Sequence, residues 1–151
     1  MPNITHTIST PADIGTVMEA ITSLDGLQKW WTTDTQGDPK TGGLIEFRFN
    51  GSGPDMSVEK VTPAEVIWKC VSGPDDWLDT TIEFHAQQNE PGKTDIYFTH
   101  RGWAVENPFH YHCSMKWAVF MLSLKEYLDL GKGRPFPNDI QIIDPTFEKT
   151  A

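Results

Sequence analysis

The sequence has few basic residues. Of its 151 residues, 12 are Lys or Arg and 21 are Asp or Glu, which gives a formal net charge of -9 at neutral pH. A protein of this charge is repelled by nucleic-acid phosphates and by anionic membrane surfaces. We therefore expect no nucleic acid and no membrane among its partners.

Long apolar runs are also lacking. No run approaches the roughly 18 residues that a membrane-spanning helix needs. Residues 1–5 do not show a basic region that leads into an apolar stretch and a cleavage site. A cytoplasmic protein is the expectation that follows.

Cysteine is scarce, with Cys70 and Cys113 as the two examples. A domain of this size buries enough apolar surface without a disulfide, so free, buried thiols are predicted. Nucleophile constellations, phosphate-binding loops and dinucleotide fingerprints are absent from the sequence, and we expect no cofactor.

Aromatic residues, in contrast, are plentiful: six Trp, eight Phe and three Tyr. Each large ring removes about 150–250 Å² from water and forms a flat, rigid wall, which suits a core or the lining of a cavity. The length indicates one domain, expected at 1–133, and the linker-like composition after Gly131 indicates a C-terminal tail at 134–151.

Several segments have the two-residue period of a strand with one buried face. Ile4, His6 and Ile8 alternate with Thr and Ser and predict the first strand. Turn-rich links that contain Gly, Pro, Asn and Asp separate the later strands, and such short links favour antiparallel neighbours. The later strands are expected at 44–50, 56–61, 65–71, 80–86 and 95–101.

Helical spacing appears in three places. A short helix is predicted over 11–21, a further helical turn over 23–31 before a loop, and the longest apolar pattern over 108–130, with Gly131 as its cap. A helix as apolar as the last must be covered, and a curved antiparallel sheet is the one large partner available. The predicted class is α+β.

Five short segments occur in a recognisable order. A strand runs into a Pro-led helix, two tryptophans end the helix pair, two glycines enter the second strand, a Pro turn precedes a Trp-bearing strand, and the last strand ends in His, Gly and Trp. These segments lie at 8–14, 27–31, 38–47, 61–68 and 94–103. Over about residues 3–132 their order and spacing resemble the SRPBCC superfamily, in the branch of homologues of the activator of heat-shock-protein ATPase.

The resemblance implies a helix-grip fold, as in START and birch-pollen-allergen-like proteins. In this fold a curved antiparallel β-sheet wraps around a long C-terminal α-helix, and two short helices follow the first strand. It also implies a hydrophobic small molecule held between sheet and helix, with Trp30 and Trp31 near the entrance. The alternative is that the same rings simply fill the core. The candidate ligand-binding residues are Trp30, Trp31, Phe47, Phe49, Phe84, Phe98, His100, Tyr111, Trp117, Phe120 and Met121.

The histidines offer further candidates. His6 and His100 fall on inward-facing positions of strands that are neighbours in this fold, so they would orient a polar group of a ligand or remain core histidines. His110 and His112 precede Cys113, but residues two apart on a helix point about 200° apart, so we expect no metal site unless the first turn is frayed.

Three functions remain after these exclusions. Binding of a small hydrophobic or aromatic molecule is the leading hypothesis. A cyclase or hydrolase acting on a polyketide-like substrate is the enzyme alternative, with His100, Glu46 and Arg48 as candidate catalytic residues. Regulation of a chaperone ATPase follows from the family's name, and a homodimer is compatible with the sequence.

Overall fold

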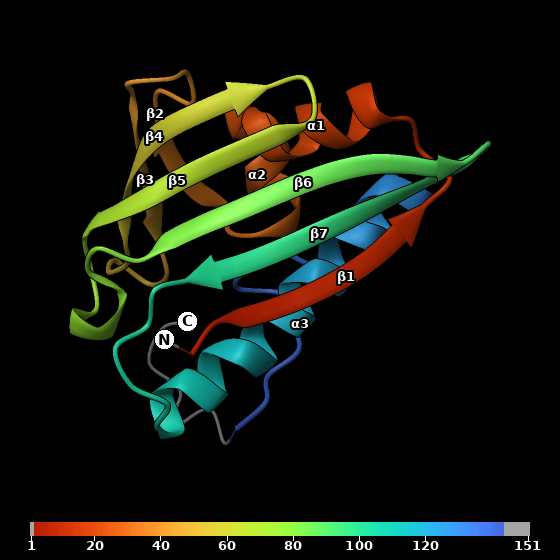
Figure 1. Ribbon diagram of the computed structural model, residues 1–151. Coiled ribbons are helices and arrows are strands. Elements are labelled where there is room, and N and C mark those ends of the chain that lie inside the picture. Colours follow the sequence, from red (N-terminus) through yellow and green to blue (C-terminus); the bar gives the residue numbers. More distant parts are fainter. Residues whose placement is uncertain (1, 144–151) are drawn as a thin grey trace.

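Seven antiparallel strands form one curled sheet in the computed structural model, which describes residues 2–143 (Figure 1). Their order across the sheet is β1-β7-β6-β5-β4-β3-β2, so the first and last strands of the chain are neighbours. The strands are β1 (Ile4–Thr10), β2 (Asp34–Gly37), β3 (Leu44–Arg48), β4 (Asp55–Thr62), β5 (Glu65–Ser72), β6 (Thr81–Glu90) and β7 (Lys93–Arg101).

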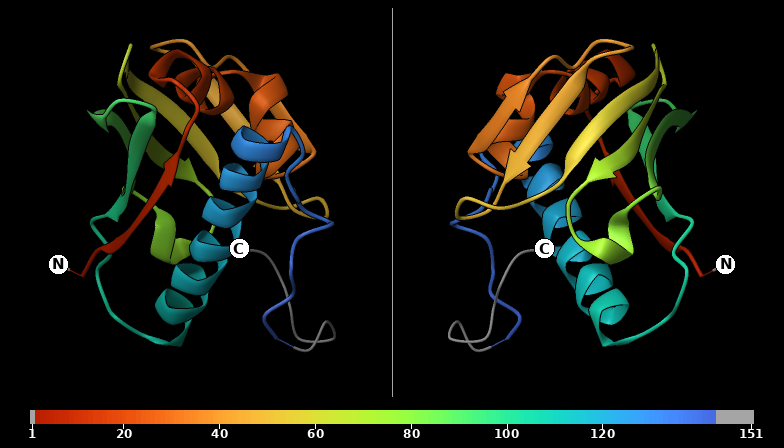
Figure 2. Two further views of the ribbon diagram at one scale, coloured as in Figure 1. Left: turned by 90° about the vertical axis from the view of Figure 1, so that its right-hand side faces the viewer. Right: turned by 90° about the vertical axis from the view of Figure 1, so that its left-hand side faces the viewer.

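Three α-helices cover the concave side of the sheet (Figures 1 and 2). Helices α1 (Ile14–Thr22) and α2 (Leu24–Trp30) lie over one end, and α3 (Pro108–Leu130) runs along the other and packs against β1. Each helix begins at a side-chain cap, of which Asn107 is an example: its oxygen accepts from the His110 amide at 3.0 Å. None of the helices within 2–143 has the length and apolar character needed to cross a membrane.

Strand alternation decides which side chains enter the interior. In β3, Ile45 and Phe47 are buried beneath the helices, whereas Glu46 and Arg48 lie half-exposed on the outer face. All six tryptophans are buried, none with more than 2% of its surface exposed. The core is therefore a largely aromatic layer between the sheet and the helices.

The α+β class and the helix-grip architecture predicted from the sequence are confirmed, and so are two free, buried cysteines. The strand β2 was not predicted, because Asp34–Gly37 is short and polar and buries one residue, Thr35. A short 3-10 helix, η1 (Asp75–Trp77), also lies where a plain turn was expected.

After α3 the chain turns back along the helix on the side away from β1 (Figure 2). We call residues 133–143 of this segment the strap. The Phe136 amide donates to the Trp31 carbonyl at 2.8 Å, and the Thr33 amide donates to the Phe136 carbonyl at 3.2 Å. Thus β1 covers one long side of α3 and the strap covers the other.

Candidate functional site

Aromatic rings fill the space between the sheet and α3. The ring of Trp31, directly after α2, lies 4.1 Å from that of Phe47 and 4.9 Å from that of Trp117, centroid to centroid. It also stacks on Trp68 at 6.3 Å, and Phe98 of β7 reaches Trp117 at 4.4 Å. Ring pairs of this geometry each contribute about 0.5–1.5 kcal/mol beyond their burial, so they stabilise the fold as well as shape the interior.

A small void remains inside this layer. It consists of gaps between side chains, and none of them has room for a water-sized sphere. Ligand pockets usually measure about 300–1,000 Å³. In this conformation the interior is therefore closed. The void is lined by Trp31, Trp77, Cys113, Lys116, Trp117 and Phe120.

The structure places most of the predicted lining residues in the interior but does not gather them around one space. Trp31, Trp117 and Phe120 line the void, and Trp30 and Trp31, which were predicted near an entrance, are both fully buried in this conformation. Tyr111 is 55% exposed and lies on the outer side of α3, so it does not face the interior. The other predicted residues are packed in the core: Phe47, Phe49, Phe84, Phe98, His100 and Met121.

His100 is held in a fully buried chain of hydrogen bonds. The Trp117 indole donates to its Nδ1 at 3.1 Å, which requires that nitrogen to be the acceptor. The other nitrogen, Nε2, then carries the proton and donates to the Thr80 hydroxyl at 2.8 Å, which itself donates to the Trp77 carbonyl at 2.6 Å. Burial, together with the charge of nearby His110, lowers the pKa of His100 to about 3.

The same geometry limits what His100 does chemically. A general base needs a free lone pair within reach of a substrate proton. The lone pair of Nδ1 is taken by Trp117 and the ring is completely enclosed. As it stands in this conformation, His100 serves to fix the position of Trp117.

His6 has a different task from His100. The register of β1 and β7 sets His6 opposite Phe98, and Ile4 opposite His100. The half-buried His6 ring bonds through Nε2 to the Ser114 carbonyl at 3.0 Å. It therefore joins β1 to α3, and none of the hydrogen bonds found within 2–143 links it to His100.

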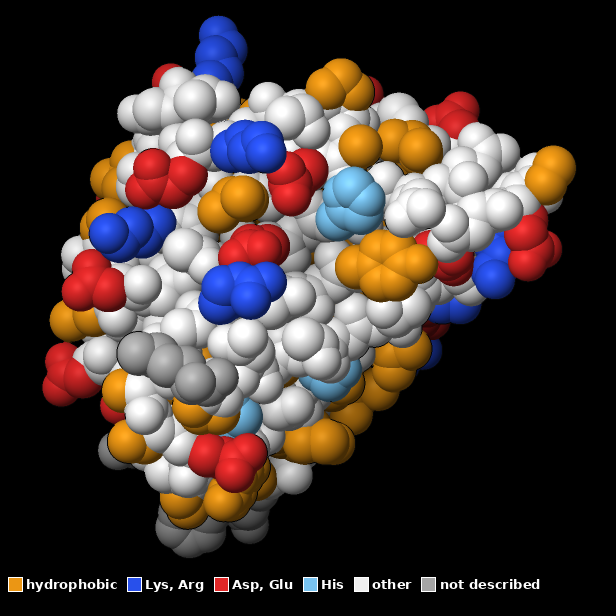
Figure 3. Space-filling view, in the orientation of Figure 1, with side chains coloured by type: hydrophobic (Ala, Val, Ile, Leu, Met, Phe, Trp, Pro, Cys, Tyr) orange, Lys and Arg blue, Asp and Glu red, His pale blue; other side chains and the backbone are white. Residues whose placement is uncertain are grey.

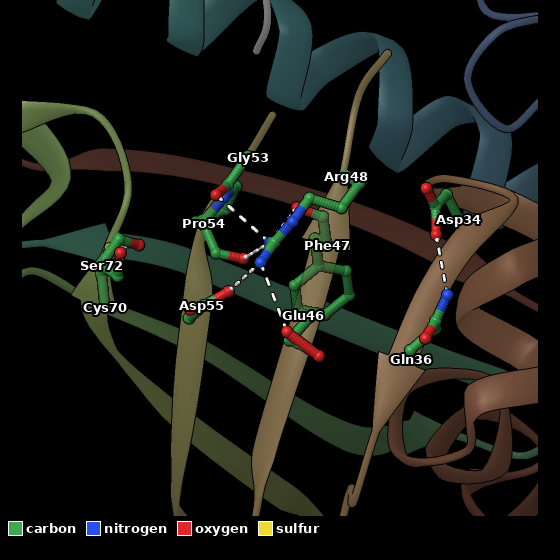
Figure 4. A network of polar contacts seen from close by, with 10 residues as sticks. All are labelled: Asp34, Gln36, Glu46, Phe47, Arg48, Gly53, Pro54, Asp55, Cys70 and Ser72. Atoms are coloured by element: carbon green, nitrogen blue, oxygen red, sulfur yellow. Dashed lines mark hydrogen bonds and ion pairs between the residues drawn. The ribbon is translucent and has the colours of Figure 1, made fainter. Parts of the chain in front are cut away.

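Glu46 and Arg48 lie on the outer face of the sheet. Arg48 Nη2 is 2.7 Å from the Asp55 carboxylate and 3.4 Å from that of Glu46 (Figure 4). This face carries acidic and basic side chains interspersed with one another (Figure 3). The sheet separates the pair from the buried His100, so the three candidate catalytic residues are not brought together.

Neither cysteine is suited to nucleophilic attack. Burial raises the pKa of the Cys113 thiol to about 12 and that of the Cys70 thiol to about 11. Cys113 accepts a hydrogen bond from the Trp77 indole at 3.4 Å, so it is part of the core.

The His110 to Cys113 segment forms the first turns of α3. His110 is buried against the ring of Trp103 at 5.0 Å, and neither of its ring nitrogens has a hydrogen-bond partner among the described residues. His112 lies on a different side of the helix and is half-buried. Within 2–143 no group of three His, Cys, Asp or Glu side chains is placed to hold a metal ion.

Sequence reasoning missed an ion pair in the interior. Lys116 of α3 meets Asp139 of the strap at 2.5 Å, with side chains 4% and 0% exposed. The signal lay in the spacing, because position 116 falls between Cys113 and Phe120 on the buried stripe of the helix. A cation there needs a buried partner, and the strap supplies one.

Comparisons with known proteins agree with this fold. The family model described as "Activator of Hsp90 ATPase homolog 1-like protein" matches residues 11–129. The solution structure of the Aha1 dimer from Colwellia psychrerythraea is 43% identical, with a TM-score of 0.81, over 88% of this chain and 100% of that one.

More distant structures share the fold alone. A protein from Staphylococcus saprophyticus is 17% identical, with a TM-score of 0.73, over 89% of this chain and 97% of that one. The solution structure of CalU16 from Micromonospora echinospora is 16% identical, with a TM-score of 0.76, over 95% of this chain and 75% of that one. Among curated protein sequences, none matches this chain.

Proposed function

Because the chain belongs to the family of Activator of Hsp90 ATPase homolog 1-like proteins, we propose that it binds a small hydrophobic or aromatic molecule between the sheet and α3. This is the place in which helix-grip proteins commonly hold such ligands. The observation that carries the proposal is the void bounded by Trp31, Trp117 and Phe120, since flat apolar walls of this kind favour planar apolar ligands.

Entry of a ligand requires the interior to open, because the closed void is too small. The strap is the segment best placed to move. Its Asp139 contacts Lys116 in the wall of the void, and its Phe136 is anchored by main-chain bonds to Trp31 and Thr33. Displacement of the strap would uncover the long side of α3 that β1 does not cover.

Binding is favoured over catalysis by the positions of the polar groups. The buried His100 has its acceptor nitrogen occupied, while Glu46 and Arg48 lie on the opposite face of the sheet. A ligand in the proposed site would meet aromatic walls and Lys116, and no general base with an accessible lone pair is apparent among the residues that line the void.

A titration with an uncharged aromatic probe tests the proposal. Adding 2-naphthamide to the full-length protein should shift the indole N–H resonances of Trp31 and Trp117 in NMR spectra. Phe120→Ala should enlarge the site and tighten binding severalfold, whereas Tyr111→Ala, on the outer side of α3, should leave it unchanged. Absence of binding by both the natural protein and Phe120→Ala would falsify the proposal.

We also propose that the chain forms a homodimer through α3. Tyr111, Met115 and Leu122 are each 55% exposed, and their spacing places them on one side of the helix. Figure 3 shows hydrophobic side chains along the edge where α3 runs past β1. The related Aha1 structure from Colwellia is itself a dimer.

Sedimentation measurements test the homodimer. Leu122→Lys should convert dimer to monomer, because it places a charge within the apolar stripe. The matched control is Val71→Lys, at an exposed apolar residue of β5. A natural protein that remains monomeric across the accessible concentration range contradicts the proposal.

Regulation of a chaperone ATPase is a second candidate function, favoured by the family to which the chain belongs. It predicts that the purified protein increases ATP hydrolysis by an Hsp90-type chaperone. An unchanged rate at saturating amounts of this chain removes the candidate.

A further inference from the structure

A groove runs between the last turns of α3 and the strap. It is open to solvent and has a volume of about 370 Å³, and we call it the outer groove. Three exposed apolar side chains line it, Leu122 and Leu130 from α3 and Ile140 from the strap. Leu122 also belongs to the apolar stripe of α3 through which we propose the homodimer. The outer groove therefore continues that stripe from the helix onto the strap.

The charges of the outer groove favour a second copy of this chain as its occupant. Its charged lining residues are Lys125, Glu126, Asp129 and Arg134, so two cations and two carboxylates cancel. Lys125 Nζ lies 2.7 Å from the Asp129 carboxylate. Arg134 Nε lies 2.9 Å from the Glu126 carboxylate.

This local neutrality matters because each copy carries a formal charge of -9. Two such copies repel one another wherever acidic surface faces acidic surface. A neutral surface that holds both signs can instead face its own copy across a twofold axis. A different partner attracted by charge would require an excess of one sign, which the outer groove lacks.

The strap connects the outer groove to the interior. The Arg134 amide donates to the Ser123 hydroxyl of α3 at 2.7 Å, and Phe136 is held by main-chain bonds to the segment after α2. The Asp139 side chain is completely buried, whereas Ile140, the next residue, is exposed and lines the outer groove. A partner that packs on Ile140 therefore restrains the same stretch of chain that covers the side of α3 (Figure 2).

From this arrangement, and resting on the proposed homodimer and binding function, we infer that the partner copy packs on the outer groove and holds the strap closed over the interior. The proposed ligand enters when the strap moves, so dimer formation and ligand binding oppose each other. The opposition is reciprocal, because the ligand must weaken the dimer by the same factor by which the dimer weakens ligand binding. The kind of partner that this surface fits is thus a second copy, and its effect is to keep the interior closed.

Hydrogen exchange of the full-length protein tests the inference without a ligand. The residue 136 and Thr33 amides report on the strap, because their bonds join it to the rest of the chain. Both should exchange about fivefold or more slowly in the dimer, at high protein concentration, than in the monomer obtained by dilution. The Asp79 amide, which bonds to the Cys70 carbonyl at 3.0 Å after η1, is the control and should not respond.

Ile140→Lys tests whether the strap itself belongs to the interface. The substitution places a charge in the outer groove and should convert dimer to monomer in sedimentation experiments. Val71→Lys, at an exposed apolar residue of β5, is the matched control and should remain dimeric. Circular dichroism confirms that each variant is folded. Should Ile140→Lys fail to fold, Leu122→Lys still gives the comparison, because its strap is unchanged and should exchange as fast as in the dilute natural protein.

The ligand provides the reciprocal measurement, with 2-naphthamide as the probe. Its addition should shift the natural protein from dimer towards monomer in sedimentation experiments. In calorimetry, monomeric Leu122→Lys should bind the probe about fivefold or more tightly than the dimeric natural protein does. Val71→Lys should bind it as the natural protein does.

The outcomes separate the inference from the proposals on which it rests. If the protein dimerises but the strap amides exchange equally fast in dimer and monomer, the homodimer stands and the inference is wrong. If the natural protein stays monomeric, the homodimer fails and the inference fails with it. If 2-naphthamide binds without weakening the dimer, interior binding stands and the opposition is wrong. If 2-naphthamide does not bind, the binding proposal fails, and the exchange comparison still decides whether the dimer holds the strap.

Discussion

Hydrogen bonds at both ring nitrogens hold the His100 side chain in place. Trp117 donates to one nitrogen and Thr80 accepts from the other, so the neutral ring satisfies both neighbours. Protonation would add a proton where Trp117 already donates. In addition, burial disfavours the charged form of the ring and lowers the pKa of His100 to about 3, against an ordinary value of 6.5.

This residue should make the protein less stable in mild acid. Between pH 6.5 and about 3, the unfolded chain takes up a proton on His100 and the folded chain does not. The free energy of unfolding should thus decrease as the pH falls, by up to about 1.4 kcal/mol for each pH unit from this one group. Urea unfolding at several pH values between about 7 and 5 measures the decrease.

His100→Gln isolates the contribution of the imidazole. The amide retains a donor and an acceptor but does not titrate, so the variant should be less stable near neutral pH and lose less stability on acidification. A variant with the same pH dependence as the natural protein would show that the decrease arises from other groups.

At the scale of elements, the contact between α1 and α2 depends on one glycine. A Cβ atom at Gly26 would lie 2.5 Å from the Ala20 carbonyl oxygen, too close for any side chain. Gly26 therefore allows the start of α2 to approach the end of α1, although glycine is a poor helix former. This requirement explains why a poor helix former stands in the first turn of α2.

Two glycine substitutions should have opposite effects on stability. Gly26→Ala must separate the two helices and should lower the free energy of unfolding by about 1–3 kcal/mol. Gly15→Ala, in α1, meets no atom closer than 3.5 Å and should be neutral or stabilise by up to about 1 kcal/mol. Thermal unfolding of both variants provides the comparison, and equal effects would contradict it.

The strap should respond to the loss of its aromatic anchor. Phe136→Ala removes the contact with Phe49 but leaves the main-chain bonds available. We expect faster hydrogen exchange at the residue 136 amide and at Thr33, with little change in the amides of β6 and β7. Unchanged exchange in the strap would show that its main-chain bonds suffice to hold it.

For the whole molecule, charge should govern self-association. Each copy carries a formal charge of -9, so two copies repel one another while their apolar stripes attract. The screening length falls from about 30 Å at 0.01 M salt to about 10 Å at 0.1 M. The dimer should become tighter over this range in sedimentation experiments, and weaker association at higher salt would contradict an apolar interface.

The periodicity of apolar residues in the sequence was sufficient to predict the architecture of the fold. Alternation such as Ile45, Phe47 and Phe49 identified the inward faces, and the spacing along 108–130 identified α3. The same patterns do not predict the volume of the space between the sheet and α3. They indicate that Trp31 faces the interior, but not how closely the neighbouring side chains pack against it. Whether the interior is hollow or filled therefore required coordinates.

Contacts between distant segments were also beyond the reach of local patterns. Lys116 lies on a buried stripe although polar residues of a helix usually face solvent, and its partner Asp139 comes from a tail without any periodic pattern. Glu46 and Arg48 were read as possible site residues because they share a strand face, but that face is the outer one. Only the packing of the strap and the curl of the sheet decide these positions.

The complete burial of the tryptophans has an optical consequence. Ultraviolet emission from the folded protein arises entirely from shielded indoles and should lie at short wavelength. Displacement of residues 133–143, which are bonded to the main chain of Trp31, should expose only part of this set of indoles to water, whereas unfolding would expose all of them. A small red shift of this emission at constant circular dichroism would therefore indicate that the strap has moved away from the interior. The measurement needs no added fluorophore.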